Sequence, residues 1–262
     1  MGERTSHAPG TFSWVDLSTT DAEGAKAFYG GLFGWAFDDR PVGDGVIYTM
    51  CLLDGKAVCA ISGQQEQERS QGIPPHWNNY VTVDDVGART AQAGELGGNV
   101  VVEPFDVLDA GRMSVVADPT GAVFSMWEPR SSIGAEIVNV PGALTWNELA
   151  TKDVERAKEF YGALFGWRLE DLEGDGGMRY TMVHNGDRSN GGIRAQSEME
   201  AGIPPNWLPY FATASADATV ARAGELGGAV LMPPMTVPAG RFAALADPQG
   251  AVFATFEGDF DD

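Results

Sequence analysis

FSWVDLSTTDAEGAKAFYGGLFGW, residues 12–35, returns as LTWNELATKDVERAKEFYGALFGW at residues 144–167. The two segments align without a gap, and more than half of their positions are identical. Each reads as an alternating strand followed by a helix, with an aspartate placed to cap the helix and a glycine placed to end it. A strand–helix pair that is written twice indicates a duplicated module.

Further motifs repeat along the rest of the chain. Asp118-Pro-Thr-Gly121, for example, returns as Asp247-Pro-Gln-Gly250, again just before an apolar run. Self-similarity at a fixed period is the signature of tandem repeats. The sequence therefore predicts two modules, at residues 10–130 and 142–258, joined by a linker at residues 131–141.

The hydrophobic pattern within a module alternates between strand and helix periods. In module 1 we expect strands at residues 12–17, 46–53, 56–62, 78–83, 100–105, 112–117 and 122–127, and helices at residues 22–33 and 86–96. The second helix has Asp84 or Asp85 as its cap. This order fits βαβββ units, two to a module, and an α+β fold class.

The charge balance restricts the partners. The chain has 37 acidic and 17 basic residues and a net charge of -20, so nucleic acid and anionic membranes should repel it. Cys51 and Cys59 lack a metal-type spacing and are expected to be buried hydrophobes in a reducing compartment. Without a signal-peptide pattern or a long apolar window, a cytoplasmic monomer or homodimer is expected.

The order of motifs resembles the vicinal oxygen chelate superfamily, which includes glyoxalase I, type I extradiol dioxygenases, fosfomycin-modifying enzymes and bleomycin-binding resistance proteins. The resemblance rests on D-x-x-x-A-x-x-F-Y-x-x-L-F-G-W at residues 21–35, on Val83-Asp-Asp85, and on D-P-x-G before the last strand. It covers nearly the whole chain, twice. It implies glyoxalase-like modules in which paired βαβββ units form a curved mixed sheet, shaped as a cup that holds a divalent metal in the family.

The metal positions of the family carry other residue types here. Carried over position by position, they fall on Trp14, Asn78 and Ser125 in module 1 and on Trp146, Leu208 and Ala254 in module 2. Tryptophan offers only an N–H donor, while leucine and alanine offer no ligand atom. We therefore expect no metal and no other cofactor, which places the metal-dependent activities of the family in doubt.

Strand alternation turns one acid into each cup, Asp16 and Glu148. They are candidate general bases, or counter-ions for a cationic or hydroxylated ligand; equally, each could satisfy nearby backbone or arginine donors. The candidate ligand-binding residues are Trp14, Asn78, Tyr80, Ser125 and Trp127 in the first cup and Trp146, Tyr210 and Phe256 in the second. Their aromatic rings would give a planar ligand flat, rigid walls, or they could simply fill the cups.

Three hypotheses follow for function. The favoured one is a metal-free protein that binds a small molecule, an aromatic natural product that can carry positive charge, in the manner of bleomycin resistance proteins and hence with a role in antibiotic resistance. The alternative is a metal-independent lyase, cyclase, isomerase or hydroxylase-like enzyme of natural-product metabolism that uses Asp16 or Glu148. A third is an interaction module with filled cups. If only one cup serves polar chemistry, the more polar module 1 is expected.

Overall fold

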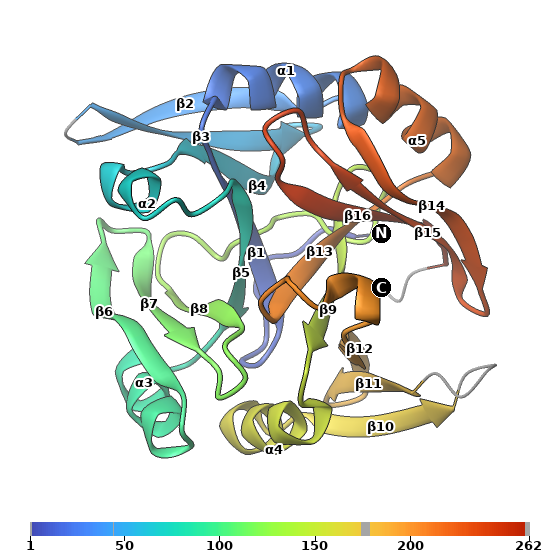
Figure 1. Ribbon diagram of the computed structural model, residues 1–262. Coiled ribbons are helices and arrows are strands. Elements are labelled where there is room, and N and C mark those ends of the chain that lie inside the picture. Colours follow the sequence, from blue (N-terminus) through green and yellow to red (C-terminus); the bar gives the residue numbers. More distant parts are fainter. Residues whose placement is uncertain (1, 44, 174–178, 260–262) are drawn as a thin grey trace.

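The two halves of the chain have the same architecture in a computed structural model that describes residues 2–43, 45–173 and 179–259 (Figure 1). Module 1 contains β1 (Phe12–Thr19), α1 (Ala22–Phe33), β2 (Ala36–Gly43), β3 (Val46–Leu53), β4 (Lys56–Gly63), α2 (Glu66–Ser70), β5 (His76–Thr82), α3 (Val86–Glu95), β6 (Asn99–Val107), β7 (Gly111–Ala117) and β8 (Val123–Pro129). Module 2 contains β9 (Leu144–Thr151), α4 (Val154–Phe165), β10 (Arg168–Glu173), β11 (Arg179–Asn185), β12 (Arg188–Ala195), the 3-10 helix η2 (Glu198–Glu200), β13 (Asn206–Ala212), α5 (Ala216–Glu225), β14 (Ala229–Val237), β15 (Gly240–Ala246) and β16 (Val252–Gly258).

Each module builds one eight-stranded mixed sheet from both of its βαβββ units. The strand orders are β2-β3-β4-β1-β5-β8-β7-β6 and β10-β11-β12-β9-β13-β16-β15-β14. The first strands of the two units, β1 and β5, pair antiparallel at the centre, and each pairs in parallel with the last strand of its own unit. The fold is α+β, and each cup is built within one module, a point that the sequence left open.

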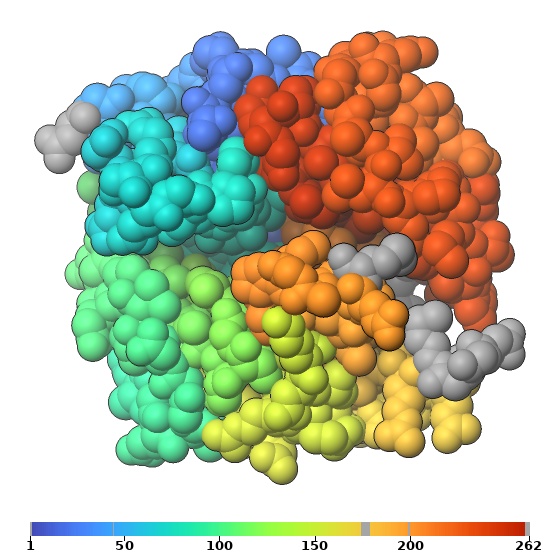
Figure 2. Space-filling view, viewed as in Figure 1, coloured from blue at the N-terminus to red at the C-terminus, as the bar shows by residue number. Residues whose placement is uncertain are grey.

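The modules pack through the sheet faces that carry the helices. One core cluster joins α1 and the first half of module 1 to α5 and the second half of module 2, and another joins the remaining halves. Helix α1 accordingly lies beside α5 at one end of the molecule, and α3 lies beside α4 at the other (Figures 1 and 2). The opposite faces of the two sheets, called cup 1 and cup 2 below, point away from each other.

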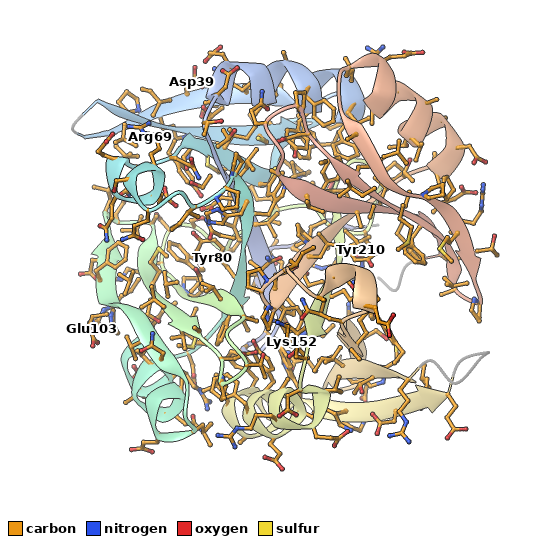
Figure 3. All side chains as sticks on the ribbon, viewed as in Figure 1. Asp39, Arg69, Tyr80, Glu103, Lys152 and Tyr210 are labelled. Atoms are coloured by element: carbon orange, nitrogen blue, oxygen red, sulfur yellow. The ribbon has the colours of Figure 1, made fainter. Side chains whose placement is uncertain are left out.

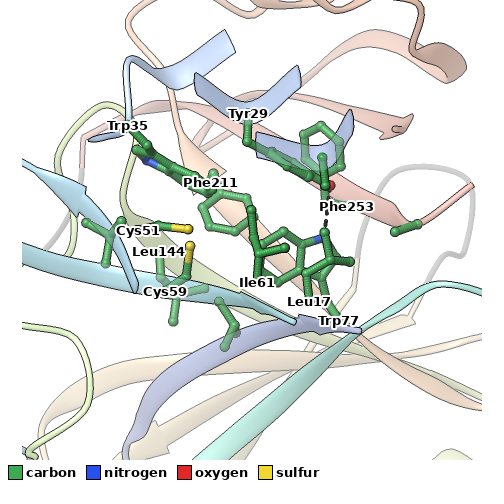
Figure 4. Close-up of a cluster of buried hydrophobic side chains, with 14 of the residues drawn as sticks. Leu17, Tyr29, Trp35, Cys51, Cys59, Ile61, Trp77, Leu144, Phe211 and Phe253 are labelled. Carbon is green, nitrogen blue, oxygen red and sulfur yellow. Dashed lines mark hydrogen bonds between the residues drawn. The ribbon is translucent and has the colours of Figure 1, made fainter. Parts of the chain in front are cut away.

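Four tryptophans belong to the core between the modules. The indoles of Trp35 and Trp167 donate to the carbonyls of Gly142 and Gly10. Trp77 packs in the first cluster and donates to the Tyr29 hydroxyl (Figure 4). Its counterpart Trp207 donates to Tyr161 in the second cluster, so both indoles serve packing between modules. The described cysteines, Cys51 and Cys59, are free and buried in the same core.

The predicted helices of module 1 are confirmed, with their caps. Helix α1 spans the predicted residues, Asp21 accepts from Gly24 N, and Gly34 ends the helix at φ 74°. For α3 the cap is Asp85 and not Asp84, because the Asp85 carboxylate accepts from Ala88 N. None of the helices in the described ranges is long and apolar enough to cross a membrane.

Two elements have no counterpart in the sequence-based prediction. Strand β2 is an edge strand whose residues are nearly all exposed, and it carries Asp38, Asp39 and Arg40 without apolar alternation. Helix α2 has only five residues, with none buried. Burial creates the periodic signal, so exposed elements of this kind leave little trace in the sequence.

Candidate functional site

Cup 1 brings its predicted aromatic residues together. Trp14, Tyr80 and Trp127 share a cluster with the side chains of Met50 and Ala60. The three rings are only 7%, 7% and 8% exposed. They come from β1, β5 and β8, where the antiparallel β1–β5 register sets Trp14 opposite Tyr80 and the parallel β5–β8 register sets Thr82 opposite Trp127. Strand alternation therefore oriented these side chains as expected.

The acid of cup 1 is the centre of a hydrogen-bond network. Asp16 accepts from Asn78 Nδ2 at 2.9 Å, from the Tyr80 hydroxyl at 2.7 Å and from the Tyr48 hydroxyl at 3.0 Å. The Trp14 indole in turn donates to the Tyr48 hydroxyl at 2.9 Å. Burial raises the pKa of Asp16 above its usual value, and the donors from Asn78 and the two tyrosines offset part of that shift.

The remaining polar candidate and the linker also contribute to cup 1. Ser125 is buried and interacts with the Tyr80 hydroxyl. Ala135 and Val138, from the predicted linker, pack into the same cluster. The Trp127 indole donates to the carbonyl of Ser132 at 3.0 Å, so this segment (residues 131–138) is fixed against the cup. The chain between the modules is therefore a wall of cup 1 as well as a connection.

Cup 2 repeats the aromatic arrangement with more exposure. The Trp146 indole donates to the Tyr180 hydroxyl at 3.0 Å, as Trp14 does to Tyr48. Tyr210 is buried and its ring centroid lies 6.2 Å from that of Phe242. Trp146 and Phe256 are half-buried. Figure 3 shows Tyr80 and Tyr210 on either side of the central strands β5 and β13, one in each cup.

The acid of cup 2 has an arginine partner, a kind of partner that the sequence analysis left open without naming the residue. Arg194 Nε lies 2.7 Å from Glu148 Oε1, and both Nη atoms of Arg194 lie 2.8 Å from the Glu200 carboxylate. In the parallel β9–β12 register Glu148 faces Gly192, so Arg194 follows two residues later on the same face. The equivalent position of module 1 is Ser62. This difference between the repeats was the signal in the sequence.

The negative charges of the two acids are therefore balanced by different groups. Asp16 is surrounded by neutral donors, whereas Glu148 shares a guanidinium with Glu200. Hydrogen bonding to Arg194 lowers the pKa of Glu200 to about 2, and Glu148 and Glu200 together raise the pKa of Arg194. The Tyr180 and Tyr210 hydroxyls also interact with Glu148, and burial raises the pKa of both phenols. Cup 2 is therefore charged but internally paired.

The donor set does not fit the divalent metal of the related enzymes. At the three ligand positions of cup 1, the Trp14 indole donates to Tyr48, Asn78 bonds Asp16, and Ser125 is the remaining side chain. Cup 2 offers Trp146, Leu208 and Ala254 at those positions. In the described ranges no three histidine, cysteine, aspartate or glutamate side chains lie close enough together to hold a metal ion. Asp16 alone in cup 1, and Glu148 and Glu200 in cup 2, which both bind Arg194, fall short of the usual coordination shell.

Two further acids have structural roles. Glu128 accepts from Val86 N at the start of α3, and Glu257 accepts from Ala216 N at the start of α5. Both therefore satisfy otherwise unpaired N–H groups of a helix N-terminus.

Both modules match a known protein family. Residues 11–126 and 143–255 match the profile of the Glyoxalase/Bleomycin resistance protein/Dioxygenase superfamily. CFP32 of Mycobacterium tuberculosis, whose name marks it as a candidate glyoxylase, is 44% identical over 259 residues, covering 98% of each chain. The anthracycline biosynthesis protein DnrV of Streptomyces peucetius is 38% identical over 266 residues, covering 97% of this chain and 95% of its own.

A solved structure supports the same fold. The Mn(II)-bound glyoxalase from Novosphingobium aromaticivorans superimposes with a TM-score of 0.65, covering 100% of this chain and 86% of its own. At 17% sequence identity, the likeness shows the shared fold alone.

Proposed function

The chain belongs to the glyoxalase/bleomycin resistance protein/dioxygenase superfamily, and from this premise we propose that it binds an aromatic small molecule of natural-product metabolism without a metal. The observation that carries the proposal is the content of the cups. Each sets tryptophan and tyrosine rings around one carboxylate, and the family's metal positions hold residues that cannot form a coordination shell. Aromatic walls with a few polar groups suit a planar ligand.

The relatives support the natural-product setting. DnrV is named for anthracycline biosynthesis and aligns along nearly the whole of both chains. Anthracyclines are planar, hydroxylated aromatic compounds, which is the chemistry that aromatic walls and an acceptor carboxylate would recognise. The proposal extends that class of ligand to this chain.

The test is a binding screen on the intact chain. Tryptophan fluorescence is followed while polycyclic aromatic compounds are added, since Trp14, Trp127 and Trp146 line the cups. We expect saturable quenching that is unchanged after dialysis against EDTA. The four core tryptophans provide an internal control, because a nonspecific quencher would act without saturation. A ligand whose binding requires added divalent metal, or no binding by any compound, would refute the proposal.

A second candidate is metal-independent catalysis by proton transfer, and the environment of Asp16 favours it. A carboxyl group with a raised pKa, next to two tyrosine hydroxyls, suits a group that accepts a proton from a substrate carbon and returns it elsewhere. An isomerase or lyase of this kind needs no oxidant. Turnover of a bound compound that is lost in Asp16→Asn or Glu148→Gln, with binding retained, would establish it over simple binding.

A further inference from the structure

The two cups differ in what they leave open to a ligand. We infer that cup 2 is the ligand site, and that it takes a neutral aromatic molecule bearing hydroxyl groups. The inference rests on the proposed function and narrows it to one module and one ligand chemistry. It differs from the sequence-based prediction, which favoured module 1 because its cup has more polar residues.

Cup 1 is closed by the protein's own side chains. Trp14, Tyr80 and Trp127 are each no more than 8% exposed, and the segment at residues 131–138 packs against them. That segment is held by Ala135 N, which donates to Ser13 O at 2.7 Å, and by the Trp127 indole. A ligand would have to displace packed aromatic surface and break these hydrogen bonds. Asn78, the polar residue that favoured this cup, is already bonded to Asp16.

Cup 2 replaces several of these groups with smaller or apolar ones. Phe256 takes the position of Trp127 and Ala254 that of Ser125, and both exchanges remove side-chain volume. Gly192 takes the position of Ala60, and the Tyr180 hydroxyl occupies the place of the missing methyl group. Trp146 is half-buried, whereas its counterpart Trp14 is only 7% exposed, so part of the Trp146 ring is open to solvent and can stack on a ligand. This ring lies in the same cup as the Glu148–Arg194 pair.

The charges of cup 2 select the ligand's polar group. Two carboxylates, Glu148 and Glu200, share the single guanidinium of Arg194, so the net charge of the group is negative and an anionic ligand is disfavoured. A cationic ligand would compete with a guanidinium that already lies 2.7 Å from Glu148, in a site where that acid is only 8% exposed. A hydroxyl group donates to the carboxylate without bringing a second charge.

Arg194 is in this view a positioning residue. Its Nε fixes one oxygen of Glu148, and its Nη atoms bind the Glu200 carboxylate on η2. Such a bidentate contact sets the orientation of both partners. The Tyr180 and Tyr210 hydroxyls interact with the same Glu148 carboxylate, and the Trp146 indole donates to the Tyr180 hydroxyl, so a ligand stacked on Trp146 would lie next to these polar groups.

Three naphthalene probes with different head groups test the inference by calorimetry on the full chain. They are 2,3-dihydroxynaphthalene, 2-naphthalenesulfonate and 2-naphthylmethylamine, which share the ring and differ in charge. We expect the dihydroxy compound to bind at least about tenfold more tightly than the others, the size of one charge-assisted hydrogen bond. Glu148→Gln should weaken its binding by about tenfold or more, and by more than the matched module 1 variant Asp16→Asn.

The outcomes separate the inference from the proposed function. Binding that is lost in Asp16→Asn but kept in Glu148→Gln would place the ligand in cup 1 and overturn the inference alone, as would tighter binding of the amine or the sulfonate. Failure of all three probes to bind would overturn the inference alone, and the proposed function would fail as well only if no polycyclic compound of the fluorescence screen bound. Urea midpoints of the two variants establish that each is folded, and Trp146→Phe against Trp14→Phe gives a second matched pair, in which the Trp146 variant should lose more affinity.

Discussion

Replacing Arg194 with serine copies the residue that module 1 has at the equivalent position, Ser62, and leaves Glu148 without its cation. The side chain of Arg194 is 23% exposed and that of Glu148 is 11% exposed, so their contact at 2.7 Å is mostly shielded from water. A hydrogen bond between charged groups contributes about 1.5–3 kcal/mol. The contact with the more exposed Glu200 adds about 0.2–1 kcal/mol after screening by solvent. We therefore expect Arg194→Ser to lower the free energy of unfolding by about 2–4 kcal/mol.

The assay is equilibrium unfolding in urea, read as a double-mutant cycle with Glu148→Gln. In the Glu148→Gln background, loss of Arg194 no longer leaves a buried charge without a partner. The loss in free energy of unfolding caused by Arg194→Ser should therefore be smaller by about 1.5 kcal/mol or more. An equal cost in both backgrounds would refute the reasoning, because the two side chains would then contribute independently. So would a cost below about 0.5 kcal/mol in the wild-type background, the size of an ordinary surface substitution.

The same pair predicts a pH dependence with a defined sign. Arg194 lowers the pKa of Glu200 from its usual 4.5 to about 2. A lowered pKa for an acid gives stability that is present above the unfolded-state value and is lost as pH falls through the folded-state value. The stability difference between wild type and Arg194→Ser should therefore narrow as the pH is lowered from about 4.5 towards about 2. A difference that stays constant across that interval would contradict the pairing.

Three further predictions concern the core and the two cups. Tyr29→Phe leaves the buried indole N–H of Trp77 without its acceptor and should cost about 1–3 kcal/mol in urea unfolding; no change in midpoint would contradict this. Because burial raises the pKa of Asp16, the folded wild-type protein loses stability as pH rises from about 3.8. The free energy of unfolding of Asp16→Asn should therefore increase relative to that of wild type over this rise and then stay constant. A pH-independent difference between the two proteins would contradict this. A Cβ at Gly192 would overlap the Tyr180 hydroxyl, so Gly192→Ala should weaken calorimetric binding of 2,3-dihydroxynaphthalene by about tenfold, and an unchanged Kd would be inconsistent with binding in cup 2.

Much of the architecture was accessible from the sequence because it is encoded locally. A helix with its cap and terminating glycine, as in α1, depends on residues within one or two turns of each other. Strand alternation likewise assigns Trp14 and Asp16 to one face and Val15 and Leu17 to the other, and the clusters of the structure follow that division. Duplication then repeats the result, so the α+β fold follows from the periodicity and the repeat together, whereas the two cups were implied by the resemblance to the family.

The interactions within each cup depend on contacts between residues that are far apart in the chain. Tyr48 reaches Asp16, Arg194 joins Glu148 to Glu200, and Ala135 closes cup 1, and no periodic pattern specifies such pairs. Sheet register and packing decide them, because they set which side chains from different strands share one face. The sequence by itself determined the duplicated fold and showed which residue types stand at the positions that the resemblance assigns to metal ligands. Only the tertiary structure decided that Asp16 lies in a closed network of neutral donors while Glu148 lies in a more open, charge-paired one.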